Sequence, residues 1–230
     1  MDTIAICPLK GEEKFNKSDM NNTTNIYANN APPFRGSGGQ GRKILIIDNY
    51  DSFTYNLVHL VNEIGLQCEV WRNDKFNISD VEVFDRIILS PGPGIPAEAG
   101  LLLEVIEKYS PSKSIFGVCL GQQAIAEVFG GKLYNLKQPM HGIATPIQVT
   151  NRHEKLFEGL PGSFKVGRYH SWVVDEKAIP DCLEITAIDE EDSSVMALRH
   201  KYFDVRGVQF HPESVLTEYG KELMQNWLAP

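Results

Sequence analysis

The sequence predicts an α/β fold in which a mostly parallel central sheet carries helices on both faces and gains mixed or antiparallel strands in the second half. Between residues 43 and 130, short apolar runs alternate with segments of helical periodicity. Such alternation is typical of a parallel sheet covered by helices. After residue 142, strand-like runs follow one another with only turns between them, which indicates an antiparallel or mixed extension of the same sheet.

Composition restricts the class of protein. The chain has 230 residues, of which 42% are hydrophobic and 23% charged, and its net charge is −8. These values are ordinary for a globular protein, and the negative charge argues against a nucleic-acid-binding surface. No apolar run reaches the roughly 18 residues of a membrane span, and the run at 4–7 is too short for a secretory segment. We therefore expect no nucleic-acid or membrane partner.

Cysteine and histidine spacing bears on the compartment and on metal content. The four cysteines lie far apart and form no C-x-x-C motif, which suits a reducing compartment better than a disulfide framework. The histidines show no metal-ligand spacing. We expect a cytoplasmic protein without a metal site.

Residues 1–42 differ from the rest of the chain. They are rich in asparagine, contain a glycine-rich run at 36–41, and show little apolar periodicity. This composition predicts a disordered extension. Residues 43–230 contain no linker or internal repeat, and we expect them to form one domain.

The first half of that domain alternates between strands and helices. The predicted strands are the apolar runs at 43–48, 68–72, 86–90 and 114–118. The first helix carries Phe53, Leu57, Leu60, Val61 and Ile64 at helical spacing, with Asp51 or Ser52 as its cap and Gly65 as its stop. Two further helices are predicted near 102–109 and at 122–129.

The second half is predicted to contain five strand-like runs, at 143–150, 164–174, 183–188, 195–199 and 205–210. A final helix beginning at Thr217 would direct Leu223, Met224, Trp227 and Leu228 toward the core. Functional loops of parallel sheets lie at the carboxyl ends of the strands. The segments 48–52, 90–96 and 119–121 all follow predicted strands, so we expect them to lie at one edge of the sheet.

A possible nucleophile lies between a predicted strand and a predicted helix. The pattern Gly117-x-Cys119-x-Gly121 has the form of a nucleophile elbow with sulfur in place of a hydroxyl. The glycines permit a strained turn and close packing beneath it. The N-terminus of the following helix favours the thiolate form of Cys119. The alternative is that Cys119 is a small apolar filler between strand and helix.

A possible base and its orienting carboxylate follow the last predicted strand. His211 ends that strand, and Glu213 lies two residues further on. The imidazole would exchange a proton with Cys119, and the carboxylate would hold the ring by a hydrogen bond. The alternative is a loop histidine followed by a surface acid or a cap for the last helix.

The run Pro91-Gly92-Pro93-Gly94 supplies a third element. Its glycines let the backbone approach a ligand closely. Pro93 has no N–H, so Gly94 is the better donor. Together with the N–H of Leu120, the N–H of Gly94 could bind a developing oxyanion. The alternative is an ordinary Pro-Gly turn.

These motifs, taken together and in this order, resemble the class I (triad-type) glutamine amidotransferases over residues 43–230. The segments that carry the resemblance are 48–54 (DNYDSFT), 90–94 (SPGPG), 117–123 (GVCLGQQ), 140–142 (MHG), 168–171 (RYHS) and 207–213 (GVQFHPE). Two positions depart from the family pattern. Trp172 stands where leucine is usual, and Ile143 stands where lysine is usual.

The resemblance implies a set of roles. Cys119, His211 and Glu213 would form the catalytic triad, and the N–H groups of Gly94 and Leu120 would form the oxyanion hole. Residues of three segments would hold L-glutamine: Gly92, Pro93, Gly94, Gln123, Ser171 and Trp172. Ammonia would pass to a separate synthase subunit that aminates chorismate.

The resemblance also implies that this chain has no cofactor, since chorismate and magnesium would be bound by the partner subunit. The motifs do not separate partners of tryptophan synthesis from those of folate synthesis. Two other interpretations stay open at this point. One is a stand-alone Cys-His hydrolase of γ-glutamyl or peptide bonds, and the other is a binding module without activity.

Overall fold

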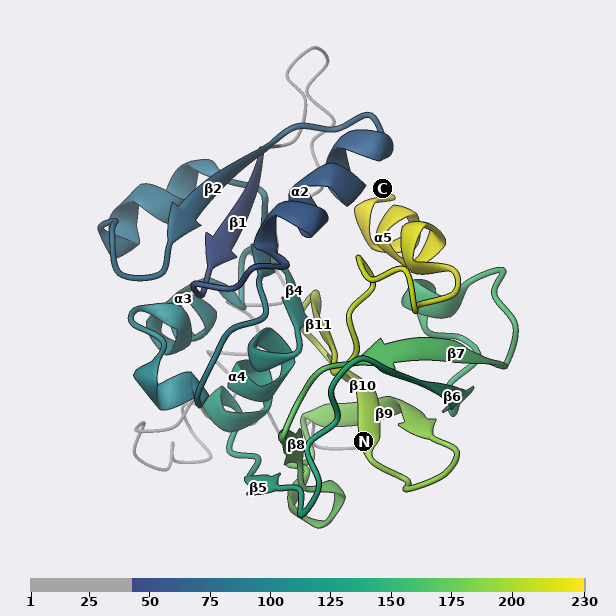
Figure 1. Ribbon diagram of the computed structural model, residues 1–230. Coiled ribbons are helices and arrows are strands. Elements are labelled where there is room, and N and C mark those ends of the chain that lie inside the picture. Colours follow the sequence, from purple (N-terminus) through teal and green to yellow (C-terminus); the bar gives the residue numbers. More distant parts are fainter. Residues whose placement is uncertain (1–42, 230) are drawn as a thin grey trace, which may run out of the picture.

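The computed structural model describes residues 43–229, so the predicted extension at 1–42 lies outside the described residues. The main sheet has nine strands in the order β2-β1-β3-β4-β11-β10-β9-β6-β7 (Figure 1). The first five strands in this order, from β2 through β4 to β11, run parallel to one another. From β11 onward to β7, each strand runs antiparallel to the one before it. The predicted α/β fold with an antiparallel extension is confirmed. Within residues 43–229, no helix is both long enough and apolar enough to span a membrane.

Buried apolar runs form the interior of the parallel part of the sheet, and its edge strand β2 is partly exposed. Its strands are β1 (Ile44–Asp48), β2 (Cys68–Arg72), β3 (Arg86–Leu89), β4 (Ser114–Val118) and β11 (Val205–Val208). The helices are α2 (Thr54–Glu63), α3 (Leu102–Tyr109), α4 (Leu120–Val128) and α5 (Gly220–Leu228). Short 3₁₀ turns occupy η1 (Ile78–Val83), η2 (Pro96–Glu98), η3 (Lys155–Phe157) and η4 (Glu176–Ala178).

Alternate residues of β1 contribute to two separate cores. Ile44 and Ile46 belong to a cluster that includes apolar residues of α2 and α5. Leu45 and Ile47 belong to a second cluster that includes residues of α3 and α4. Because side chains of a strand alternate between faces, this division places one pair of helices on each face of the sheet. Each fully buried aliphatic side chain contributes about 1.5–3 kcal/mol.

The antiparallel extension consists of β10 (Val195–His200), β9 (Leu183–Asp189), β6 (Ile143–Val149) and β7 (Ser163–Arg168). The prediction of a single strand over residues 164–174 is wrong. The chain leaves the main sheet after Arg168, and β8 (Trp172–Val174) pairs instead with β5 (Leu133–Asn135) in a two-stranded sheet. The break falls at Tyr169–Ser171, where the chain turns toward α4.

Two predicted helix starts are also wrong. No side chain caps α2, whose N-cap residue is Phe53; the Asp51 carboxylate instead accepts the N–H of Phe53 in the preceding turn, at 2.7 Å. The last helix begins at Gly220, not at Thr217. The Thr217 hydroxyl donates to the carbonyl of His211 at 2.6 Å and accepts the N–H of Gly167 at 2.9 Å. Thr217 therefore fixes the loop that follows β11.

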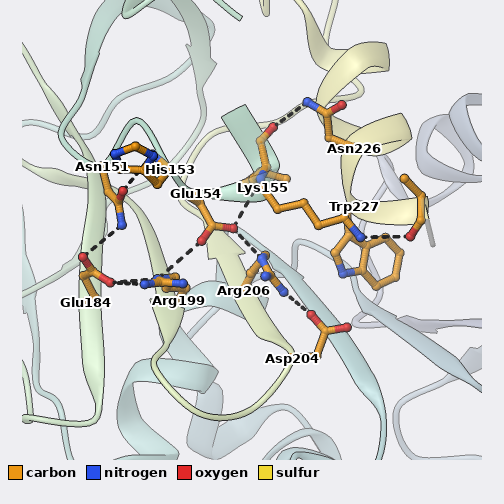
Figure 2. Close-up of polar contacts among 12 residues, drawn as sticks. Asn151, His153, Glu154, Lys155, Glu184, Arg199, Asp204, Arg206, Asn226 and Trp227 are labelled. Carbon is orange, nitrogen blue, oxygen red and sulfur yellow. Dashed lines mark hydrogen bonds and ion pairs between the residues drawn. The ribbon is translucent and has the colours of Figure 1, made fainter. Parts of the chain in front are cut away.

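A buried carboxylate near the amino end of β11 ties the sheet to the last helix (Figure 2). Glu154 is 1% exposed and pairs with Arg206 at 2.5 Å and with Arg199 at 3.4 Å. The neighbouring Lys155 donates to the carbonyl of Ala229 at 2.9 Å, and Asn226 donates to the carbonyl of Leu156 at 3.1 Å. This network lies near the amino end of β11, whereas Cys119 lies beyond the carboxyl ends of the parallel strands. We therefore assign the network to stability and not to catalysis.

His200, at the end of β10, is buried in its neutral form. Its Nδ1 accepts the N–H groups of Tyr202 at 3.1 Å and Phe203 at 2.9 Å, and its ring stacks on that of Phe203. Burial lowers the pKa of His200 to about 4, because desolvation disfavours the charged ring.

This burial predicts acid destabilisation. As the pH falls from about 6.5 toward the folded-state pKa of about 4, the unfolded chain binds a proton that His200 in the folded chain does not. We expect this residue to lower the free energy of unfolding by up to about 1.4 kcal/mol per pH unit. Urea unfolding at a series of pH values measures the slope. His200→Asn keeps an acceptor and should have a shallower slope; identical slopes would contradict the assignment.

Candidate active site

Cys119 occupies a strained turn between β4 and α4. Its φ is 52° and its ψ is −102°, a conformation rare for a residue with a side chain. Its N–H donates to the carbonyl of Val208 at 2.8 Å, which anchors the turn to the neighbouring strand β11. The residue is 6% exposed. The strand, strained turn and helix form the elbow predicted from the glycine spacing.

Two glycines permit this turn for steric reasons. A Cβ on Gly117 would lie 2.5 Å from the backbone carbon of Gly121, and a Cβ on Gly121 would lie 2.6 Å from the carbonyl oxygen of Leu89. Both contacts are with backbone atoms, which cannot move aside cheaply. Helix α4 therefore packs against β3 and β4 more closely than any larger residue would allow.

We expect Gly117→Ala to destabilise the fold by about 1–3 kcal/mol or more, because overpacking forces β4 and α4 apart. Gly130→Ala is the matched control. Gly130 has a φ of 94° and nothing within 4 Å of an added Cβ, so an alanine there meets no overlap and incurs only left-handed backbone strain, about 1 kcal/mol. Thermal unfolding of both variants measures the difference. Equal losses would contradict the steric account.

His211 and Glu213 lie together in the loop after β11. Nδ1 of His211 lies 2.7 Å from Oε1 of Glu213, and the two side chains are 2% and 0% exposed. The backbone N–H of His211 donates to the carbonyl of Gly167 at 3.0 Å. The ring of His211 makes edge-on contacts with the rings of Phe53 and Tyr169, at centroid distances of 5.1 and 4.9 Å. The imidazole is thus fixed in position and orientation.

The surroundings of His211 favour its protonated form. Desolvation alone would lower its pKa, but hydrogen bonding with Cys119 and Glu213, together with their negative charges, raises the pKa to about 10. Nε2 is buried and has no hydrogen-bond partner within the described residues, so it is the ring nitrogen that can exchange a proton with Cys119. At neutral pH, His211 is therefore an imidazolium between two potential anions.

Gln209 also contacts the sulfur, although its position in the sequence gave no direct sign of this role. Its Nε2 lies 3.4 Å from Sγ of Cys119, and its Oε1 accepts from Nε2 of Gln123 at 3.0 Å. Gln123 also donates to the carbonyl of Trp172 at 2.8 Å. The available signal was a polar residue inside the apolar run 205–210, because a buried polar side chain requires partners.

The loop after β3 lies beside the elbow. The Asn49 side chain donates to the carbonyl of Ser90 at 2.8 Å, and the Ser90 hydroxyl accepts the N–H of Asn49 at 2.8 Å. A Cβ on Gly92 would lie 2.6 Å from both the Asn49 Cβ and the Leu120 Cδ2. Gly92 is therefore held against the first residue of α4.

The two predicted oxyanion donors are free in the described part of the chain. No hydrogen bond within residues 43–229 uses the N–H of Gly94 or of Leu120. Gly94 has a φ of 74°, which glycine adopts readily. Pro93 precedes it in the same exposed turn. Both N–H groups thus remain available to a ligand.

The segment at 171–172 adjoins Gln123. The carbonyl of Ser171 accepts the N–H of Leu136 at 2.7 Å, and the carbonyl of Trp172 accepts from Gln123 and lies 3.1 Å from Nδ1 of His170. Both residues are partly exposed. The structure thus brings the segment toward Gln123 through backbone contacts. The predicted role of these residues toward glutamine stays a prediction.

The arrangement has the elements of acyl transfer through a covalent intermediate: a cysteine, an imidazolium that can give and recover a proton, and a carboxylate that orients the ring. Within residues 43–229, no group of three or more histidine, cysteine or acidic side chains could hold a metal ion. Cys119, His211 and Glu213 supply a nucleophile, an acid–base group and an orienting carboxylate.

Comparison with known proteins agrees with this geometry. The family model described as "Glutamine amidotransferase class-I" matches residues 45–229. "Anthranilate synthase component 2" of Pseudomonas putida is 47% identical over 191 residues, covering 80% of this chain and 96% of the relative. "Aminodeoxychorismate synthase component 2" of Escherichia coli (strain K12) is 46% identical over 187 residues, covering 80% and 98%.

Two further matches bear on the fold and on the subfamily. "Aminodeoxychorismate/anthranilate synthase component 2" of Bacillus subtilis (strain 168) is 44% identical over 187 residues, covering 80% of this chain and 95% of the relative. The crystal structure of a candidate GMP synthase protein from Thermoplasma acidophilum superimposes with a TM-score of 0.74 at 27% identity, covering 83% of this chain and 94% of that one. The likeness therefore extends to the three-dimensional structure.

Proposed function

Because the chain belongs to the class I glutamine amidotransferase family, we propose that it is a glutaminase subunit that supplies ammonia to a chorismate-aminating synthase. It hydrolyses L-glutamine to glutamate through a γ-glutamyl thioester on Cys119. The observation that carries this proposal is the buried pair of His211 and Glu213, 2.7 Å apart, in the loop after β11, which is the strand beside the one that leads into the strained cysteine elbow.

In the first half of the reaction, the Cys119 thiolate attacks the carboxamide carbon of glutamine. The oxygen of the tetrahedral intermediate accepts hydrogen bonds from the N–H groups of Gly94 and Leu120. One such donor typically contributes about 2.7–4 kcal/mol to transition-state stabilisation. His211 then protonates the leaving nitrogen, the carbon–nitrogen bond breaks, and ammonia and the thioester are formed.

In the second half, His211 is neutral and acts as the base. It removes a proton from water, and the hydroxide oxygen attacks the thioester carbon. The carbon–sulfur bond breaks, which releases glutamate and restores the thiolate and the imidazolium. Glu213 holds Nδ1–H throughout, so that Nε2 carries every transferred proton.

Glutamine would be bound by the two loops and the helix that surround Cys119. The backbone of Gly92, Pro93 and Gly94 lines one side, with Gly92 packed against Leu120. Gln123 and the backbone of Ser171 and Trp172 line the other. Support comes from the hydrogen bond between Gln123 and the Trp172 carbonyl, which joins these residues. Backbone contacts of this kind tolerate the change from leucine to tryptophan at position 172.

We assign the partner to anthranilate synthase, so that the ammonia serves tryptophan biosynthesis, with aminodeoxychorismate synthase in folate biosynthesis as the alternative. The identities of 47% and 46% to the two kinds of relative are equivalent. A role shared by both pathways is supported by the double name of the Bacillus subtilis relative. Chorismate and magnesium would bind to the synthase partner, and this chain would act without a cofactor in the cytoplasm.

Glutamate release from glutamine tests the proposal when it is measured for the purified chain alone and with each synthase partner, in the presence of chorismate. Activation only by the anthranilate-forming synthase narrows the role to tryptophan synthesis, and activation only by the aminodeoxychorismate-forming synthase narrows it to folate synthesis. Activation by both makes the role a shared one. Cys119→Ser is the inactive control. Full activity of the isolated chain on γ-glutamyl compounds, unchanged by any partner, would overturn the proposal in favour of a stand-alone hydrolase.

A further inference from the structure

We infer that Gln209 donates a hydrogen bond that stabilises the Cys119 thiolate, and that Gln123 and the Trp172 carbonyl fix the direction of that bond. This inference rests on the proposed role of Cys119 as the nucleophile. It adds a residue that contacts the reacting sulfur to those given by the triad.

The Gln209 side chain is placed with little freedom. It is 0% exposed, and its backbone N–H donates to the carbonyl of Met196 at 2.9 Å. Its Nε2 lies 3.4 Å from Sγ of Cys119, within hydrogen-bond range for sulfur. A buried amide without a partner would cost about 1–3 kcal/mol, so the contact with the sulfur also satisfies Gln209.

The direction of the hydrogen bond follows from its neighbours. A backbone carbonyl can only accept, so the atom of Gln123 that lies 2.8 Å from the Trp172 oxygen must be Nε2. The same NH₂ group reaches Oε1 of Gln209 at 3.0 Å. The Gln209 oxygen is thus occupied as an acceptor, and its NH₂ group is turned toward Cys119. The hydrogen-bond network therefore fixes the orientation of both amides.

The Trp172 carbonyl is itself held by a buried histidine, which a buried arginine holds in turn. Nδ1 of His170 lies 3.1 Å from this oxygen, and Nε2 of His170 lies 3.1 Å from Nε of Arg168. Arg168 is 1% exposed and pairs with Asp189 at 2.9 Å. Since the guanidinium can only donate, His170 carries its proton on Nδ1 and donates it to Trp172. The donor and the acceptor of each hydrogen bond between Asp189 and the sulfur are therefore assigned.

A neutral amide donor suits this position. It favours the anionic sulfur over the neutral thiol, since hydrogen bonds to charged groups are stronger than those to neutral ones. It cannot release its proton at any accessible pH, so His211 remains the group that exchanges protons. When the sulfur becomes a thioester the bond weakens, and it strengthens again when the thiolate leaves. Gln209 thus favours the return of the enzyme to its starting state.

The test is the rate at which iodoacetamide alkylates Cys119, resolved from other cysteines by peptide mass spectrometry, in the full chain without glutamine or a partner. Gln209→Met keeps the size of the side chain and removes the donor. Measured over a series of pH values, the rise of the alkylation rate with pH should lie at higher pH in Gln209→Met than in wild type, by the equivalent of about tenfold, or about 1.4 kcal/mol. At pH values above both rises, the two rates should be equal. A structural displacement of Cys119 would also change the rate above both rises.

Gln122→Met is the matched control. Gln122 is a buried glutamine of α4 that bonds the carbonyl of Val195 at 3.4 Å instead of the sulfur, and its variant should alkylate at the wild-type rate. Gln209→Leu is the second variant: its side chain has no donor, and its alkylation profile should move to higher pH about as far as that of Gln209→Met. A wild-type pH profile of alkylation in both folded Gln209 variants would overturn the inference. Because the alkylation assay needs no glutamine, its result can be interpreted even if the proposed function is wrong.

Discussion

Cys119→Ser is expected to lower glutamate release from glutamine by at least about 10³-fold without unfolding the chain. A serine hydroxyl at the same position is not ionised at neutral pH, and loss of a nucleophile in a triad typically removes most of the catalysis. The remaining oxyanion donors and glutamine contacts account for any residual activity. A coupled assay for glutamate measures kcat, and thermal unfolding shows whether the fold is retained.

Cys68→Ser is the control for the loss of a thiol. Cys68 lies on the edge strand β2, and burial raises the pKa of its thiol to about 11, so it stays protonated at neutral pH. Its replacement should leave glutamate release unchanged. Retention of substantial activity in Cys119→Ser would show that the sulfur of Cys119 is not the nucleophile.

Glu213→Gln is expected to lower kcat by roughly 10²–10⁴-fold while the neutral side chain keeps the volume of the original. The carboxylate favours the imidazolium form of His211 through a hydrogen bond and through its charge. Its removal lowers the pKa of His211 from about 10. Because protonation of the leaving nitrogen needs the imidazolium, the alkaline limb of the pH profile of kcat should move to lower pH.

Glu218→Gln provides the matched control. This exposed residue of the same loop accepts the N–H of Lys165 at 2.8 Å and does not contact His211. It should retain kcat and the alkaline limb of wild type. An alkaline limb that does not move in Glu213→Gln would contradict the role assigned to the carboxylate.

The sequence predicted the interior of the parallel half of the fold because β1, β3 and β4 are buried on both faces. A run such as Ile44–Ile47 has no polar position, and a glycine or a helical segment follows each run. The glycine spacing around Cys119 predicted the elbow. The structure shows that only glycine fits at positions 117 and 121. Cys119, His211 and Glu213 could be found because each follows a predicted strand, and the topology brings these strand ends together.

The errors arose where long-range packing decides local structure. The segment 164–174 is rich in strand-forming residues, but its second part, from Trp172, pairs with β5 instead of the main sheet. Threonine is a favourable helix cap, but the Thr217 hydroxyl donates to the carbonyl of His211. Gln209 was missed because its role depends on contacts with residues 86 and 90 positions away in the sequence.

Interception of the thioester by hydroxylamine tests the central claim most directly. If glutamine acylates Cys119, hydroxylamine competes with water for the γ-glutamyl group. We expect γ-glutamyl hydroxamate to form at the expense of glutamate in wild type, and neither product from Cys119→Ser. Glutamate release without any hydroxamate, over hydroxylamine concentrations that leave the chain folded, would contradict a covalent intermediate on Cys119.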